Sequence, residues 1–107
     1  MATTKQQVQK VCEEMGDVLA NLLCFYQPED GGHYGWTSPA PAIIQCSGTE
    51  LPERTFDAGY GGTNGEPVIC FSDRYVYIKV QYDGSEWIEA IPRHPEFVKD
   101  SIPWPGG

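Results

Sequence analysis

The sequence predicts an α+β fold in which one N-terminal amphipathic helix packs on one face of a four- to five-stranded antiparallel sheet. Three observations indicate this class: apolar side chains recur at helical spacing near the N-terminus, short apolar runs follow in the middle, and a long hairpin pattern covers 74–92. A length of 107 residues is typical of one domain. We therefore expect a single domain over 1–107 with frayed ends at 1–2 and 101–107.

The helix is expected within TTKQQVQKVCEEMGDVLANLLCFY, which starts at Thr3. At about 100° per residue its apolar side chains fall within an arc of roughly 140°, which is wide enough to lie across a sheet. These apolar positions are Val8, Val11, Cys12, Met15, Val18, Leu19, Leu22 and Leu23. Thr3 or Thr4 can cap the first turn, with a glutamine three residues later as the return partner. Gly16 costs about 1 kcal/mol of helix propensity, and we attribute it to a close approach between the helix and the sheet, with a bend as the alternative.

Three short segments between the helix and the hairpin are predicted as strands. AIIQC (42–46) and PVICF (67–71) are apolar runs and are expected to be buried. The stretch from Glu53 to Asp57 is expected to be short and partly exposed.

The hairpin 74–92 allows two registers around Asp83-Gly84. A two-residue loop pairs Val80 with Trp87 and places the carboxylate of Glu89 beside Ile78. A three-residue loop with a left-handed Gly84 pairs Val80 with Glu86. We favour this second register because it collects aliphatic side chains on one core face, namely Val76, Ile78, Val80, Ile88 and Ala90. The opposite face then carries Tyr75, Tyr77, Lys79, Gln81, Trp87 and Glu89, either as a binding surface or beneath another segment.

The net charge of −8 narrows the classes of partner. Most of the excess lies in residues 26–66, where one arginine faces six acidic residues. Such a field repels nucleic acid and anionic membranes and favours a basic protein surface. The chain has no apolar run of about 20 residues and no apolar signal-peptide core near its start, so we expect a cytoplasmic protein.

The four cysteines, Cys12, Cys24, Cys46 and Cys70, are expected to be reduced. No two of them have the C-x-x-C spacing of a zinc site, so we predict neither a metal nor a cofactor. Cys46 and Cys70 are interpreted as small core residues within strands.

The glycine-rich stretch GYGGTNGEP (59–67) resembles a phosphate-binding loop only at first sight. A P-loop needs a lysine and then Ser or Thr at the start of a helix, whereas this stretch ends in Glu66 and Pro67 and leads into a predicted strand. We interpret it as a loop that contacts a partner through Tyr60.

These features favour a small acidic protein without catalytic activity that binds a basic protein partner, as inhibitors and immunity proteins do. Acidic side chains would accelerate the encounter and aromatic side chains would supply contact energy. The predicted surface comprises Glu29, Asp30, Tyr34, Trp36, Glu50, Glu53, Asp57, Tyr60 and Glu66.

Two alternatives stay open. One is a small-ligand-binding domain that uses the glycine loop 59–66 as a lid and Tyr60, Trp36 and Trp87 as stacking walls. The other is a minimal hydrolase or thiol enzyme in which Cys24 pairs with His33, although the usual hydrolase motifs are missing from the sequence.

Overall fold

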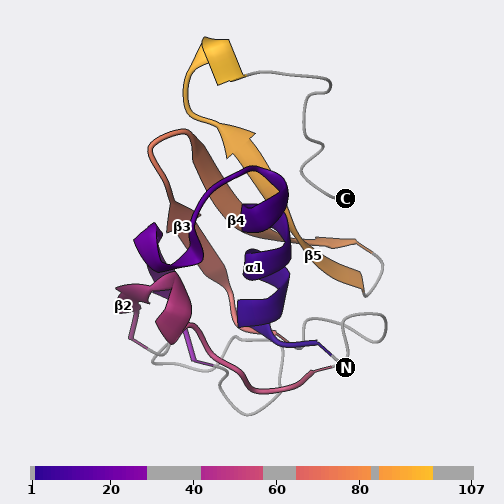
Figure 1. Cartoon of the computed structure of the whole chain (residues 1–107). Helices are drawn as coiled ribbons and strands as arrows, with labels where there is room; N and C mark the ends of the chain where they lie inside the picture. The colour runs from indigo at the N-terminus through magenta and orange to yellow at the C-terminus, as the bar shows by residue number, and fades with distance from the viewer. Residues whose placement is uncertain (1, 29–41, 57–64, 83–84, 98–107) are drawn as a thin grey trace.

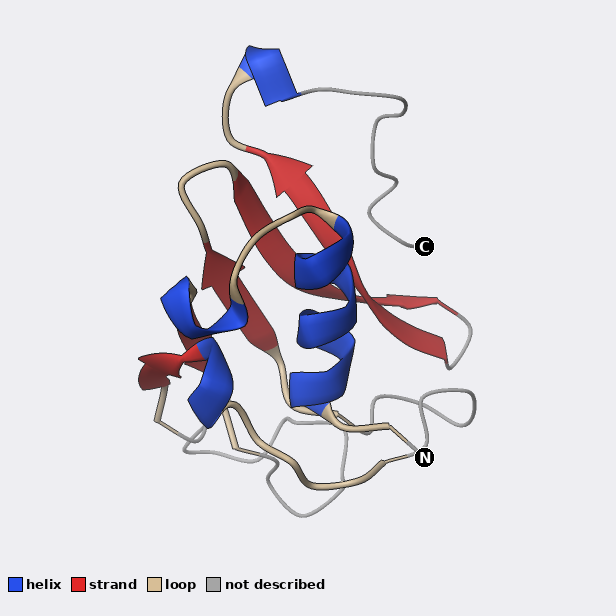
Figure 2. Ribbon diagram, viewed as in Figure 1, coloured by secondary structure: helices blue, strands red, loops and turns tan. Residues whose placement is uncertain are grey.

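The structure is a computed structural model that describes residues 2–28, 42–56, 65–82 and 85–97. One α-helix lies across one face of a five-stranded antiparallel sheet, with strand order β2-β1-β3-β4-β5 (Figures 1 and 2). The elements, including the 3₁₀ helices η1–η3, are α1 (Thr4–Glu14), η1 (Leu19–Asn21), β1 (Leu23–Tyr26), β2 (Ile44–Ser47), η2 (Gly48–Glu50), β3 (Val68–Phe71), β4 (Tyr75–Tyr82), β5 (Ser85–Pro92) and η3 (Pro95–Phe97). The predicted α+β fold is confirmed.

The N-terminus of α1 has the predicted capping box. The Thr3 hydroxyl accepts a hydrogen bond from the Gln6 amide at 3.0 Å, and the Gln6 side chain accepts one from the Thr3 amide at 3.2 Å. Both donors would otherwise lack an intrahelical partner, so the box fixes the point where the helix begins.

The predicted extension of the helix to residue 23 is wrong, because α1 ends at Glu14. Gly16 has a positive φ of 78°, and the amides of Gly16 and Asp17 bond back to the carbonyls of Glu13 and Cys12. This pair of bonds is a Schellman motif, which reverses the chain at a left-handed glycine. The apolar residues after it continue the helical spacing but enter η1 and β1.

The strand predictions hold best at the centre of the sheet. β3 is confirmed as a strand between β1 and β4. β2 is an edge strand whose Ile44 is 39% exposed, so the prediction of a buried strand there is wrong. Residues 53–56 contribute only an isolated bridge between Phe56 and Ala2.

The favoured hairpin register is also wrong. β4 and β5 pair Tyr82 with Ser85, Val80 with Trp87 and Ile78 with Glu89, which is the register of the two-residue loop. The face beneath α1 carries Tyr75 and Tyr77, which are 1% and 0% exposed, while Val76, Ile78 and Val80 occupy the other face. The tyrosine rings fill the space between the helix and the sheet, and the Tyr77 hydroxyl finds a partner in Asp17, so burial leaves no polar cost at Tyr77.

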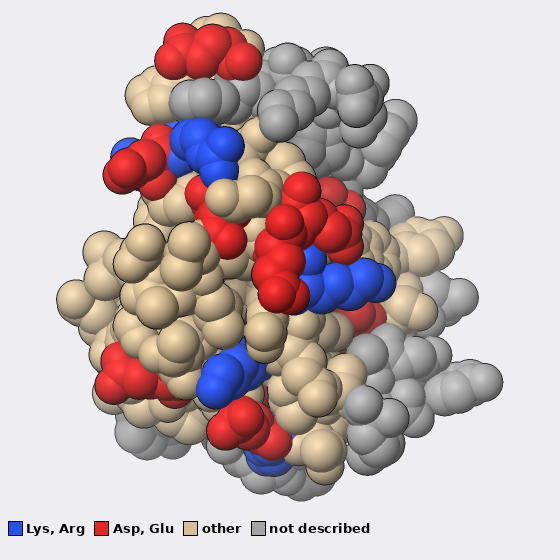
Figure 3. Space-filling view, in the orientation of Figure 1, with Lys and Arg blue, Asp and Glu red and all other residues tan. Residues whose placement is uncertain are grey.

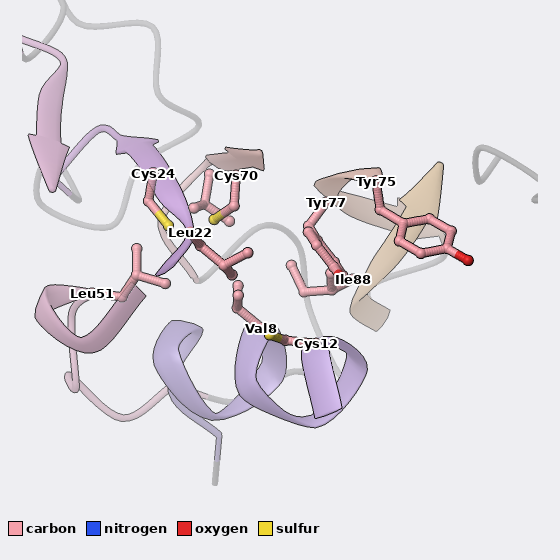
Figure 4. Packing of buried hydrophobic residues seen from close by; sticks show 10 residues of the cluster. Val8, Cys12, Leu22, Cys24, Leu51, Cys70, Tyr75, Tyr77 and Ile88 are labelled. Carbon is pink, nitrogen blue, oxygen red and sulfur yellow. The ribbon is translucent and has the colours of Figure 1, made fainter. Parts of the chain in front are cut away.

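The core lies between α1 and the sheet. Figure 4 shows Val8 and Cys12 of the helix directed toward side chains of the strands. The buried cluster consists of Val8, Cys12, Leu22, Cys24, Leu51, Val68, Cys70, Tyr75, Tyr77 and Ile88. The helix therefore covers one sheet face, and the alternation of side chains directs a second set to the face opposite α1.

Candidate functional site

Six residues of the predicted partner-binding surface lie outside the described residues: Glu29, Asp30, Tyr34, Trp36, Asp57 and Tyr60. Of the others, Glu53 is exposed and its carboxylate lies 3.7 Å from the Lys5 amine. Glu50 is exposed and caps η2 by accepting a hydrogen bond from the Ser47 amide at 2.9 Å. That bond holds the pKa of the Glu50 carboxyl below its ordinary value. Binding of a partner by these residues stays a prediction.

Glu66 does not belong to an exposed acidic surface, and that prediction is wrong. Its side chain is 4% exposed. One carboxylate oxygen accepts a hydrogen bond from the Thr4 hydroxyl at 2.7 Å, and the other lies 3.1 Å from Nε of Arg54. Because burial without a partner is costly for a charge, Glu66 acts as a structural tie between α1 and residue 54.

A buried ion pair lies beside Glu66. Nζ of Lys79 is 3.5 Å from Oε1 of Glu86, and the two side chains are 8% and 0% exposed. The Glu86 carboxylate also accepts the Gly65 amide, at 3.1 and 3.2 Å. Lys79 additionally lies 3.3 Å from the Thr4 hydroxyl and 4.6 Å from the centre of the Phe56 ring. The network therefore joins β4, β5, the start of α1 and the segments around residues 54–56 and 65–66.

Burial lowers the pKa of the Lys79 amine, while the nearby carboxylates of Glu86 and Glu66 oppose that shift. A lysine with a lowered pKa can act as a nucleophile in enzymes. Here the amine is surrounded by Glu86, Thr4 and Phe56, and it lines neither of the two pockets described below. The arrangement supports a structural role.

Four of the six lysines and arginines in the described part of the chain are paired with its own acids. The pairs are Lys5–Glu53, Arg54–Glu66, Arg74–Asp17 and Lys79–Glu86. In Figure 3, basic side chains on the helix side of the molecule likewise border acidic ones. The internal pairing leaves mostly acidic groups to meet a partner.

The sheet face opposite α1, here called the outer face, is largely apolar along β1, β3, β4 and β5, although Glu89 also lies on it, opposite Ile78. Strand register and alternation place nine apolar residues on it: Leu23, Phe25, Ile69, Phe71, Val76, Ile78, Val80, Trp87 and Ile91. Leu23 and Ile69 are 44% and 37% exposed. The rings of Phe25 and Phe71 meet edge to face, with centres 6.1 Å apart. Such an apolar surface is typical of a protein contact.

A small apolar pocket opens beside this face where β1 and β3 meet the approach to β2. Its volume is about 210 Å³. It is lined by Phe25, Tyr26, Gln27, Ile43, Pro67, Val68 and Ile69. Ile43, at its rim, is 67% exposed. This volume is below the 300–1,000 Å³ of typical small-molecule sites and suits one inserted side chain.

A second, more polar pocket of about 490 Å³ lies at the other end of the sheet, where α1 ends. Arg74, Arg93, Asp17 and Asp73 all line it, so its charges balance. Arg74 is held by Asp17 at 2.8 Å, and the Arg93 side chain donates to the Ser72 carbonyl. The pocket therefore suits a small polar molecule without net charge.

The predicted aromatic face of the hairpin is divided between the two sides of the sheet. Tyr75 and Tyr77 are buried on the α1 side of the sheet, whereas Trp87 lies on the outer face and donates to Glu89 at 2.8 Å. Cys24 is fully buried in β1, and His33 lies outside the described residues. A buried thiol is poorly placed to attack a substrate.

Neither α1 nor any 3₁₀ helix in the described ranges is long and apolar enough to cross a membrane. Among the same residues, no group of three or more His, Cys, Asp or Glu side chains could hold a metal ion. Within the described residues, the two pockets and the outer face are the surfaces from which a function is argued below. Comparison of the chain with protein-family models, with curated proteins and with solved structures finds no match.

Proposed function

We propose that this chain is a non-catalytic cytoplasmic protein that binds a protein partner through the outer face of its sheet. The observation that carries the proposal is the row of apolar side chains opposite α1, all of them exposed or half-buried except the buried Val80, with Leu23 and Ile69 the most exposed. Burial of apolar area is the main favourable contribution to most protein association. Ile78 lies beside Ile69 in the same row, which gives the face a continuous centre.

The size of the adjoining pocket favours a protein over a small ligand. About 210 Å³ accommodates one large side chain but little of a metabolite. A partner that lays an apolar surface on the outer face could insert an aliphatic or aromatic anchor between Ile43 and Ile69.

Charge defines the partner further. Since four described basic residues are already paired internally, the net charge of −8 is presented largely by unshared carboxylates. A partner with a basic rim around an apolar centre is complementary to this surface, whereas nucleic acid is repelled. We expect the acids to raise the association rate and the outer face to set the lifetime of the complex.

Paired affinity capture from native lysate tests the proposal. The baits are the wild-type chain, Ile69→Glu on the outer face, and Gln9→Glu on the exposed side of α1 as a control with the same added charge. We expect a protein that the wild type and Gln9→Glu retain and Ile69→Glu loses. Thermal unfolding of all three baits establishes that they are folded. If no captured protein distinguishes Ile69→Glu from Gln9→Glu, the outer face is not the binding site.

Association kinetics with the captured protein, once purified, test the charge argument separately. We expect the association rate to fall steeply with added salt, while the dissociation rate changes little. A rate that is independent of salt contradicts electrostatic steering but leaves the outer face as the contact surface.

The second candidate function is binding of a small polar ligand in the pocket of about 490 Å³, which falls in the usual range for such sites. A thermal-shift screen with neutral and zwitterionic metabolites tests it, because a ligand that binds only the folded state raises the melting temperature, increasingly so as its concentration exceeds Kd. A hit that disappears in Arg93→Ala supports this pocket. The version with 59–66 as a lid involves residues outside those described, apart from Gly65 and Glu66, which the network with Glu86 and Thr4 already holds.

A further inference from the structure

Three cysteines form one row across the sheet. Cys24 of β1 is directly opposite Cys46 of β2 on one side and directly opposite Cys70 of β3 on the other. All three lie on the side of the sheet that packs against α1. The row combines residues that are 22 and 46 positions apart in the sequence, so it is a product of the fold.

The hydrogen-bond pattern shows that the two cysteine pairs differ. The Gln27 amide donates to the Pro67 carbonyl at 3.2 Å, so the position pair 27/67 is hydrogen-bonded. Hydrogen-bonded and non-hydrogen-bonded pairs alternate along antiparallel strands. Position pair 26/68 is therefore not hydrogen-bonded, 25/69 is, and 24/70 is not. The backbone of a residue bonds to one neighbouring strand only, so Cys24 bonds to Cys46 on the other side.

Directly opposed positions of both kinds fall within the range of Cα distances that a disulfide can span. Opposed Cα atoms lie about 4.5 Å apart in a non-bonded pair and about 5.5 Å apart in a bonded one, and disulfides span about 4.4–6.8 Å. Side chains come closest in the non-bonded pair, here Cys24 and Cys70.

Access to solvent differs along the row. Cys24 and Cys70 are 0% exposed, whereas Cys46 is half-buried on the edge strand. The neighbouring Cys70 thiol lowers the pKa of the Cys24 thiol, whereas Cys24 and burial raise the pKa of Cys70. Burial and the neighbouring Cys24 and Glu50 raise the pKa of Cys46, so its reaction with an oxidant is expected to be slow.

We propose that this row is an oxidation site. A peroxide first oxidises Cys46, Cys24 then forms a disulfide with Cys46, and this disulfide is finally exchanged for one between Cys24 and Cys70. Hydrogen peroxide oxidises the Cys46 thiol to a sulfenic acid and releases one water molecule. The Cys24 thiol then attacks that sulfur, which forms the Cys24–Cys46 disulfide and releases a second water molecule. The Cys70 thiol next attacks the Cys24 sulfur, so that a Cys24–Cys70 disulfide forms and Cys46 leaves as a thiol.

The final disulfide, unlike the first, is fully shielded from solvent. It joins two fully buried residues of the central strands and closes a loop of about 46 residues, so it raises the melting temperature of the oxidised protein. The released Cys46 thiol stays half-exposed and is available to a second oxidant or to a partner thiol. Cys12, which is buried on α1 in the same core, is outside the row and serves as the control.

The experiment treats the purified full chain with hydrogen peroxide, then alkylates free thiols and measures intact mass and disulfide-linked peptides. We expect the loss of two hydrogen atoms, a fall from four free thiols to two, and a final Cys24–Cys70 link that a small dithiol reverses. Cys46→Ser is expected to slow the reaction at least tenfold. Cys70→Ser is expected to stop at Cys24–Cys46, and Cys12→Ser to behave as the wild type.

Two results overturn the proposal: a disulfide that contains Cys12, or oxidation of Cys46 to sulfinic acid with Cys24 and Cys70 still free. Because a serine in the core can unfold the chain, Cys70→Val provides a second apolar variant. Peptide mapping of the wild type decides the linkage without any substitution.

Discussion

The guanidinium of Arg74, the residue just before β4, donates a hydrogen bond to the carboxylate of Asp17 at 2.8 Å. The same nitrogen donates to the carbonyl of Met15, at 3.1 Å, which is one of the last acceptors of α1. The other oxygen of Asp17 accepts the Tyr77 hydroxyl. Asp17, just after the helix, therefore fixes the end of α1 to β4. This tertiary contact holds the Schellman motif at Gly16 in place.

We predict that Asp17→Ala destabilises the protein by about 2–3 kcal/mol, because it removes hydrogen bonds to a charged acceptor and leaves the Tyr77 hydroxyl without its partner. Urea unfolding measures the loss. Asp73→Ala, at an exposed turn position that also borders the polar pocket, is the matched control and is expected to change stability by less than about 0.5 kcal/mol. Equal losses of unfolding free energy in the two variants would show that the Asp17 contacts do not stabilise the protein more than an exposed aspartate does.

The Asp17 contacts also predict a dependence on pH. Burial disfavours the charged carboxylate, but hydrogen bonds from Tyr77, Arg74 and Ser72 outweigh that effect and hold the pKa of Asp17 below its ordinary value of 3.8. The unfolded chain then binds more protons than the folded one just below 3.8, so this stabilisation is complete above that pH and is lost as the pH falls through the folded pKa. We expect the stability difference between wild type and Asp17→Asn to be constant above about pH 5 and to shrink as the pH is lowered from there to about pH 3. A difference that is constant over this range would contradict the lowered pKa.

The buried pair Lys79–Glu86 predicts a strong asymmetry between single and double variants. Lys79→Met leaves the fully buried Glu86 without its counter-ion and is expected to cost about 3–5 kcal/mol. In Lys79→Met/Glu86→Gln we expect a large part of that loss to be recovered, because no unpaired charge is left and the glutamine oxygen can still accept the Gly65 amide. Lys5→Ala at the exposed Glu53 pair is expected to cost less than about 1 kcal/mol. Additive losses at Lys79 and Glu86 would argue against a coupled buried pair.

The fold class could be predicted from the sequence because it depends on which kinds of element are present and not on where each element ends. The capping box at Thr3 and the apolar run of β3 are local signals, and the structure confirms both. The end of α1 could not be placed by periodicity, since Leu19 and Leu22 keep the helical spacing by chance. The conformation of Gly16 decides the boundary, and a glycine in a sequence permits a left-handed conformation without requiring it.

The prediction of the hairpin register was wrong for a different reason. Both faces of β4 are rich in apolar or aromatic residues, so alternation alone does not say which face meets the helix. We assigned the aliphatic side chains of β4 to the core in preference to the tyrosines, and this assignment was wrong. The outer face was consequently missed as a candidate surface. An indication was present in Val76, Ile78 and Val80, which would have marked a second apolar face had the tyrosines been assigned to the core. The contacts of Glu66 with Thr4 join positions 62 residues apart, and no spacing rule detects such a pair.

Gly16 provides a test of how α1 ends. We predict that Gly16→Ala costs about 1–2 kcal/mol, because an alanine strains the backbone at a φ of 78°. A Cβ at this position would lie 3.5 Å from the Arg74 guanidinium, an ordinary contact, so the cost arises from the backbone and not from a clash. Gly16→Asn is expected to cost less than alanine, since asparagine tolerates the left-handed region better. Urea unfolding of the two variants measures the difference, and an asparagine variant no more stable than the alanine variant would show that something other than left-handed strain determines this boundary.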